Sequence, residues 1–147
     1  MALTLTAQDL EAIRAHAQQT YPEECCGLLL GTDKTVVQVI PTANSWSEAV
    51  AVYFQELDPA PHGKNDRFSI DPQTLLQVQK EARNRNLNII GIYHSHPDHP
   101  AVPSACDRRL AWPEYSYVIV SVTLNQVRSW LLAESGEFQA EAIVIGD

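Results

Sequence analysis

The chain has 147 residues, of which 45% are hydrophobic and 19% are charged, and its formal net charge is -8. This length is enough for one domain with a core of its own, over residues 1–147, so neither a structural metal nor a disulfide is needed for folding. The excess of acidic residues argues against nucleic acid as a partner, because most of the surface would repel a phosphate backbone.

The N-terminal part predicts a helix followed by a β-hairpin. Thr6 and Asp9 resemble a capping box in front of apolar residues at helical spacing, so we expect a helix over about residues 7–19. The β-rich runs CCGLLLG and TVVQVI, which are joined by the turn sequence TDK, predict a hairpin of two buried strands.

The middle of the chain contains a segment without periodicity, then a helix and a strand. Residues 41–67 mix aromatic residues with Pro, Gly and Asn, and their LDPAPHGKND part is typical of a loop. Asp71 and Pro72 form a good N-cap and first-turn pair, and the apolar spacing after them predicts a helix to about Asn86. The run NIIGIYH then predicts a short apolar strand.

The C-terminal part is rich in β-strand sequence. After one or two helical turns expected from Ser104 to about Ala111, the runs YSYVIVSV, VRSWLLA and FQAEAIVI predict three strands. Helices and strands interleave early in the chain and strands dominate late. The expected fold class is therefore α/β (α+β), with a single mixed β-sheet flanked by helices.

Features of the sequence that bear on location favour the cytoplasm. No apolar run reaches the roughly 18 residues of a membrane span, and the N-terminus lacks the basic start and the apolar stretch of a signal peptide. The three cysteines are an odd number, and Cys25 and Cys26 are adjacent, which favours free thiols in a reducing compartment. We expect a cytoplasmic protein without a membrane partner.

Residues 93–107, YHSHPDHPAVPSACD, concentrate side chains that bind metals. His94 and His96 stand two apart at the end of a predicted strand, so both imidazoles can point to one face. Asp107 is expected in the first turn of the following helix, from which its carboxylate could return to the same point. Two imidazoles and one carboxylate suit Zn2+, and three protein ligands leave the open position of a catalytic site.

A catalytic zinc site needs a general base. Glu24 begins an apolar run, where a carboxylate is unusual unless it faces a cleft, and Glu23 is its neighbour and rival. Strand alternation places the two side chains on opposite faces, so only one can serve. Ser104 and Asp107, taken alone, also fit an ordinary helix-capping pair.

Together these residues resemble the signature of the MPN/JAMM family of zinc metalloproteases. That signature is a glutamate near the N-terminus, then His-x-His, seven residues, serine, two residues and aspartate. His94, His96, Ser104 and Asp107 match it without a gap, and the family's glutamate stands three residues before a glycine, which selects Glu24. The resemblance covers roughly residues 10–132 and is to the compact prokaryotic branch.

The resemblance implies an MPN-like fold and an enzyme. It implies that His94, His96 and Asp107 bind zinc, that Glu24 is the general base, and that Ser104 donates a hydrogen bond to the developing oxyanion. It also implies a peptidase or isopeptidase that cleaves after the C-terminal Gly-Gly tail of a ubiquitin-like or sulfur-carrier β-grasp protein.

The resemblance also suggests where such a tail would bind. Asn44, Phe68 and residues 45–66 are expected to border its groove, where it could pair with a strand edge. His99 is expected at the rim of the cleft.

Two other function classes remain open. A cysteine hydrolase could pair Cys26 or Cys106 with His94 or His99, and it would survive a chelator but not an alkylating agent. A catalytically inactive MPN-type binding scaffold is the other alternative, although such proteins typically lose the ligands that this chain keeps.

Overall fold

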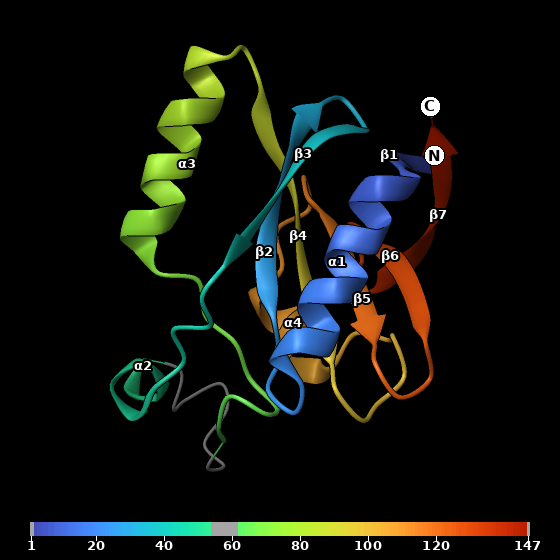
Figure 1. The fold of residues 1–147 in the computed structure, drawn as a ribbon. Helices are drawn as coiled ribbons and strands as arrows, with labels where there is room; N and C mark the ends of the chain where they lie inside the picture. Colours follow the sequence, from blue (N-terminus) through green and yellow to red (C-terminus); the bar gives the residue numbers. More distant parts are fainter. Residues whose placement is uncertain (1, 54–61, 147) are drawn as a thin grey trace.

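The computed structural model, which describes residues 2–53 and 62–146, is built around a β-sheet that closes into a barrel (Figure 1). The strand order is β1-β3-β2-β4-β5-β6-β7, and β7 returns to pair with β1. The strands are β1 (Ala2–Thr6), β2 (Cys26–Thr32), β3 (Thr35–Thr42), β4 (Asn88–His96), β5 (Ser116–Ser121), β6 (Gln126–Leu132) and β7 (Phe138–Gly146). The helices are α1 (Ala7–Thr20), α2 (Glu48–Val52), α3 (Pro72–Asn84) and α4 (Ala105–Leu110).

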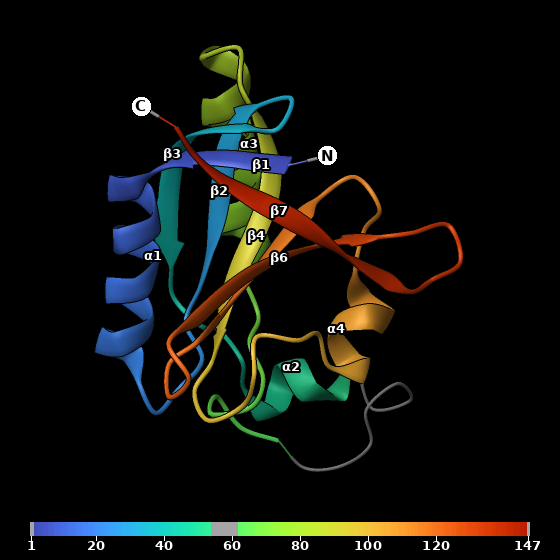
Figure 2. The same ribbon diagram turned by 90° about the vertical axis from the view of Figure 1, so that its right-hand side faces the viewer.

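The sheet is mixed, as the sequence predicts. Strand β1 runs parallel to β3 and β7, and β4 runs parallel to β5, whereas the other neighbouring pairs are antiparallel. The predicted α+β class is therefore confirmed. Closure of the sheet was not predicted, because it depends on β1, a short N-terminal strand that the sequence analysis missed. Figure 2 shows β1 and β7, the two ends of the chain, lying against each other.

The central strand β2 is buried on both faces, which explains its uninterrupted apolar sequence. Leu29 packs in one core cluster with Ile13 of α1. Leu28 and Leu30, on the opposite face, pack in a second cluster with Val78 of α3. The two helices thus cover opposite faces of this part of the sheet and fix the strand that leads back to Glu24.

The predicted helices begin where their capping residues indicate. Thr6 Oγ1 accepts a hydrogen bond from the Asp9 amide at 3.0 Å, and Asp71 accepts one from the Gln73 amide at 2.8 Å. Both helix starts are therefore confirmed. Among the described residues, no helix is both long and apolar enough to cross a membrane.

One expectation about the first half of the chain was wrong. Strand β3 is not buried along its length, since Val36 is its one fully buried residue and Val37 is 51% exposed. The reason is that α3 covers β2 and β4 but leaves one face of β3 to solvent. Within residues 41–67, the predicted loop LDPAPHGKND spans residues 57–66; residues 62–66 form no helix or strand, as predicted, and residues 57–61 lie outside the described part. Ahead of that loop, Ser47 caps the short helix α2, for which no prediction was made.

A buried ion pair connects the β2–β3 turn to the C-terminal strands. Lys34 Nζ lies 3.2 Å from Glu141 Oε2 and donates a hydrogen bond to Ser116 Oγ at 2.7 Å. Ser129 Oγ donates to Glu141 Oε1 at 2.7 Å, and the Glu141 side chain is 0% exposed. Removing the lysine would leave a buried carboxylate without its cation.

We therefore expect Lys34→Met to lower the free energy of unfolding by about 3 kcal/mol, as is typical when one partner of a buried pair is removed. Urea denaturation measures this loss. Glu11→Ala is the matched control, because Glu11 forms an exposed pair with Arg14 and its removal should cost less than about 1 kcal/mol. Equal losses in the two variants would contradict the assigned role of Lys34.

Candidate metal centre

Three potential metal ligands meet where β4 ends and α4 begins. Strand β4 extends through His96, two residues beyond the predicted run, and presents His94 and His96 on one face. Their Nε2 atoms are 3.2 Å apart, and Asp107 Oδ2 lies 3.4 Å from each of them. The ligand atoms all lie within 4.8 Å of one another, so the predicted set is brought together as expected.

The surrounding groups orient these ligands toward a common point. The carbonyl oxygen of Pro100 lies 2.9 Å from His96 Nδ1 and can only accept, so Nδ1 donates and Nε2 is left with a free lone pair. The His94 ring stacks on Phe68, with ring centroids 4.5 Å apart and an interplanar angle of 22°. Such fixed orientations are typical of metal-binding histidines.

The capping box of α4 also holds the third candidate ligand, Asp107, in place. The Asp107 amide donates to Ser104 Oγ at 3.0 Å, and the Ser104 amide donates to Asp107 Oδ2 at 2.9 Å. This capping box at the start of α4 is the ordinary alternative considered for these residues. It does not compete with metal binding, because the cap holds the Asp107 carboxylate beside the two histidines.

The electrostatics of the site favour a cation. Burial would raise the pKa of Asp107, but the charge of His94 and the hydrogen bonds of His94, His96 and the Ser104 amide outweigh it and hold that pKa well below its usual range. Burial would lower the pKa of His94, but Asp107 outweighs it and the pKa is raised. A half-buried carboxylate with two imidazole nitrogens facing it fits a divalent metal that prefers nitrogen and oxygen ligands.

Glu24 lies two residues before the start of β2 and lines the same cleft as the ligands. It is buried, with 6% of its surface exposed, whereas Glu23 is exposed. The two glutamates differ in exposure as expected, but strand alternation is not the cause, because both lie ahead of β2. Burial raises the pKa of Glu24 to about 7, although His94, His96 and Arg67 partly oppose the shift. A carboxyl group with a pKa near neutrality suits a general base.

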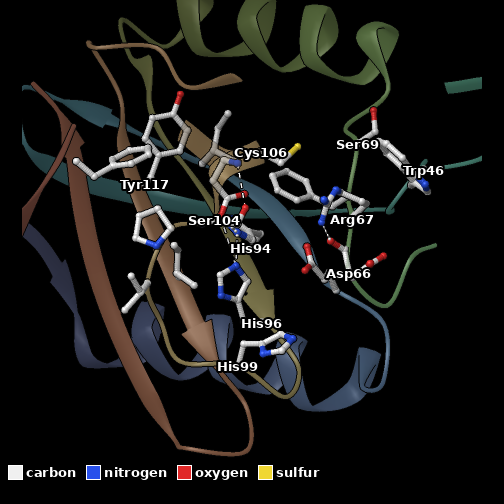
Figure 3. A pocket seen from close by; sticks show the side chains of 18 of the residues that line it. Trp46, Asp66, Arg67, Ser69, His94, His96, His99, Ser104, Cys106 and Tyr117 are labelled. Atoms are coloured by element: carbon white, nitrogen blue, oxygen red, sulfur yellow. Dashed lines mark hydrogen bonds and ion pairs between the residues drawn. The ribbon is translucent and has the colours of Figure 1, made fainter. Parts of the chain in front are cut away.

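A cleft of about 790 Å³ contains the site. Figure 3 shows His94, His96 and Ser104 between Tyr117 on one side and Arg67 on the other. Phe68 and His99 line the cleft, as expected from the sequence. The lining side chains of β5 and β7 were not predicted, because alternation alone does not say which face of a strand meets the cleft. Trp112, expected in the core or in the cleft wall, lines the cleft, and the lining residues that were not predicted include Ile92 of β4, Tyr117 and Ile119 of β5 and Phe138 of β7.

The groove-bordering segment is only partly as expected. Trp46 and Asp66 of the predicted segment 45–66 line the cleft, and residues 54–61 lie outside the described part. Asn44 is not a lining residue; its side chain instead hydrogen-bonds backbone groups behind the cleft wall. Its role is therefore internal support.

The cysteines divide into two groups. Burial raises the pKa of Cys25 to about 12 and the pKa of Cys26 to about 11, so neither is a ready thiolate at neutral pH. Cys106 lines the cleft. Of the cysteine nucleophiles considered from the sequence, Cys106 is the one whose position keeps that alternative open.

The sequence places this geometry in a known family. The family described as prokaryotic homologs of the JAB domain matches residues 6–133. The chain belongs to this family. Its predicted membership is thus confirmed, and the match covers β2 to β6 and every candidate site residue.

Curated relatives of this JAB-domain chain are named as peptidases. A desampylase of Haloferax volcanii is 31% identical, over 81% of this chain and 80% of the relative. A probable TtuB-protein conjugate cleaving protease of Thermus thermophilus is 34% identical, over 87% and 74%. A CysO-cysteine peptidase of Mycobacterium tuberculosis is 30% identical, over 90% and 84%. The prediction that this chain is an enzyme of the peptidase class is therefore confirmed by the relatives.

Solved structures of JAB-domain proteins share the fold. A solution structure of a protein from Desulfitobacterium hafniense is 33% identical, with a TM-score of 0.78 over 99% of this chain and 93% of that one. A JAB1/MPN domain protein of Archaeoglobus fulgidus is 17% identical, with a TM-score of 0.56 over 97% and 99%. The predicted MPN-like architecture is therefore confirmed.

Proposed function

We propose that this JAB-domain protein is a zinc-dependent peptidase or isopeptidase that cleaves after the C-terminal Gly-Gly tail of a ubiquitin-like or sulfur-carrier protein. The observation that carries the proposal is the convergence of His94, His96 and Asp107 beside the buried carboxyl group of Glu24 in one open cleft. The names of the relatives, which act on protein conjugates and on CysO-cysteine, support the substrate class.

In this proposal His94, His96 and Asp107 hold the zinc ion through Nε2, Nε2 and Oδ2. These three donors are the set typical of catalytic zinc, which keeps one coordination position open. A bound zinc ion would act as a Lewis acid on the scissile carbonyl and make water acidic near neutral pH. Because the capping box fixes Asp107 and Pro100 fixes His96, little ordering of the ligands is needed on binding.

Glu24 is the proton carrier in this mechanism. Its carboxylate takes a proton from the attacking water and passes it to the nitrogen of the leaving group, so that the amine departs neutral. Burial keeps the carboxylate away from bulk water and gives it the raised pKa that both transfers need. Glu23 is exposed and cannot take this role.

Ser104 is the proposed donor to the developing oxyanion. Its Oγ accepts the Asp107 amide hydrogen in the capping box, and that cap does not use the hydroxyl proton. The hydroxyl can therefore donate into the cleft, which Ser104 lines. A preorganised donor of this kind stabilises the transition state more than the ground state.

Ser104→Ala is expected to lower kcat by about 10²-fold or more if the hydroxyl stabilises the oxyanion. The variant should keep its zinc, as measured by elemental analysis. Thr6→Ala is the matched control, since Thr6 caps α1 away from the cleft and its loss should cost about 1 kcal/mol of stability without changing the rate. A Ser104 variant that loses stability but turns over normally would show that the residue is only a cap.

The proposed substrate class can be tested directly. The protein is incubated with candidate β-grasp carriers extended beyond their terminal Gly-Gly, with and without a chelator, and the products are read by intact mass. Release of the extension only without chelator supports the proposal. Turnover that survives the chelator and is abolished by an alkylating agent would instead favour a Cys106 hydrolase, and binding without cleavage would favour the scaffold.

We also propose that residues 1–147 form one domain and that the protein acts in the cytoplasm.

A further inference from the structure

The peptide bond that follows Glu24 is held by two side chains rather than by the sheet. Asn44 Nδ2 donates to the Glu24 carbonyl oxygen at 3.1 Å, and Ser95 Oγ accepts from the Cys25 amide at 2.8 Å. The Glu24 amide itself donates to the Lys64 carbonyl oxygen at 2.7 Å. The backbone polar groups on both sides of the Glu24 side chain are therefore fixed from outside β2.

Ser95 replaces a backbone acceptor at the point where β2 and β4 separate. The regular register between these strands ends at the pair Cys26 and His94. At the next pair, the Ser95 amide donates to the Cys25 carbonyl oxygen at 3.1 Å, but the Cys25 amide donates to Ser95 Oγ. In a regular antiparallel pair both bonds join backbone groups. The side-chain acceptor therefore ends the regular β2–β4 ladder at Cys25, so that Glu24 lies outside the ladder.

Asn44 connects the Glu24 backbone to the segment around Arg67. Besides the bond to Glu24, its Nδ2 donates to the Arg67 carbonyl oxygen at 3.0 Å. Its Oδ1 accepts from the amides of Trp46 at 3.0 Å and Ser69 at 3.2 Å. One amide group thus joins the Glu24 backbone to the segment that carries Phe68, the residue stacked on His94.

We infer that Ser95 and Asn44 are positioning residues for the general base, and we call them the peptide clamp. Ser95 lies between the two histidines in the sequence, is 0% exposed and is not among the residues that line the cleft. Its backbone places His94 and His96, while its side chain places the peptide of Glu24. One residue therefore fixes the distance between the ligands and the base. This inference rests on the proposed role of Glu24.

The experiment compares Ser95→Ala with Ser95→Thr, which keeps the acceptor oxygen. Ser95→Ala is expected to lower kcat by about 10- to 100-fold, because a small misplacement of a reacting group has effects of this size. KM should change by less than about threefold and the zinc content should stay at the wild-type level, since neither substrate contacts nor ligands are removed. Ser95→Thr should recover most of the lost kcat. The same split between kcat and KM is expected for Asn44→Ala.

Ser121→Ala is the matched control. Ser121 is equally buried and pairs with His96 across β4 and β5, and its Oγ accepts the Leu124 amide instead of a bond near Glu24. Its kcat should stay close to that of the wild type. Wild-type kcat in Ser95→Ala, loss of zinc from it, or an equal loss of kcat in Ser121→Ala would each overturn the inference.

Hydrogen exchange of the Cys25 amide provides a readout that does not depend on activity. In Ser95→Ala this amide should exchange at least about tenfold faster than in the wild type, because its acceptor is gone. Unchanged exchange would overturn the clamp even if the wild-type protein proved to have no peptidase activity. Absence of chelator-sensitive turnover in the wild type, with faster exchange in the variant, would overturn the proposed function and leave the clamp as a structural feature.

Discussion

Glu24→Gln is expected to lower kcat by about 10²- to 10⁴-fold, the range that a general acid–base group contributes. Glutamine has nearly the same shape as glutamate but cannot take a proton from water or give one to the leaving nitrogen. The cleft, the ligands and the bound metal should be unaffected, because Glu24 lies outside the set formed by His94, His96 and Asp107. The measurement is steady-state cleavage of an extended Gly-Gly carrier, together with elemental analysis of the same preparation.

Glu23→Gln is the control for that experiment. It removes the same charge from the neighbouring residue, which is exposed and does not line the cleft, so its turnover should match the wild type. A Glu24→Gln protein that retains wild-type turnover would exclude Glu24 as the base. A Glu24→Gln protein that loses its metal would show that Glu24 acts as a ligand.

His96→Ala is expected to abolish stoichiometric zinc binding and, with it, activity. The substitution removes one of three ligands and leaves two, fewer than the three that catalytic zinc sites use. It also removes the ring whose Nδ1 bonds to Pro100. Elemental analysis after gel filtration measures the metal content, and cleavage of the extended carrier measures the activity.

His99→Ala is the matched control for the ligand experiment. His99 lies three residues further along the same loop, is exposed and lines the cleft, but does not belong to the ligand cluster. Its zinc content should equal that of the wild type. Full zinc occupancy in His96→Ala, or an equal loss in His99→Ala, would contradict the assigned ligand set.

Much of the fold could be predicted because the relevant signals are local. The starts of α1, α3 and α4 follow from the capping residues Thr6, Asp71 and Ser104, which bond to amides two or three residues away. Strand β1 was missed because five residues give little periodicity. Its partners in β7 lie at the other end of the chain, as in the pair of Leu3 with Ile143. Closure of the sheet therefore depends on contacts that no local pattern encodes.

The candidate metal ligands could be named from the sequence itself. The spacing from His94 and His96 to Ser104 and Asp107 is short, and a strand followed by a capped helix turn can bring these groups together by local geometry alone. Glu24 could be named only through its place before Gly27 and the resemblance that this completes. Nothing in the residues themselves sets its distance from the histidines.

Only the tertiary structure decided how Glu24 is held and what surrounds it. Asn44, Lys64 and Ser95, from three separate segments, fix the backbone on either side of Glu24, and strands β5 and β7 supply one wall of the cleft. The physical reason is the distance along the chain over which each interaction acts. Caps, turns and alternation act over a few residues. Burial of a carboxyl group and the shape of a cleft depend instead on distant chain segments that meet only in the folded protein.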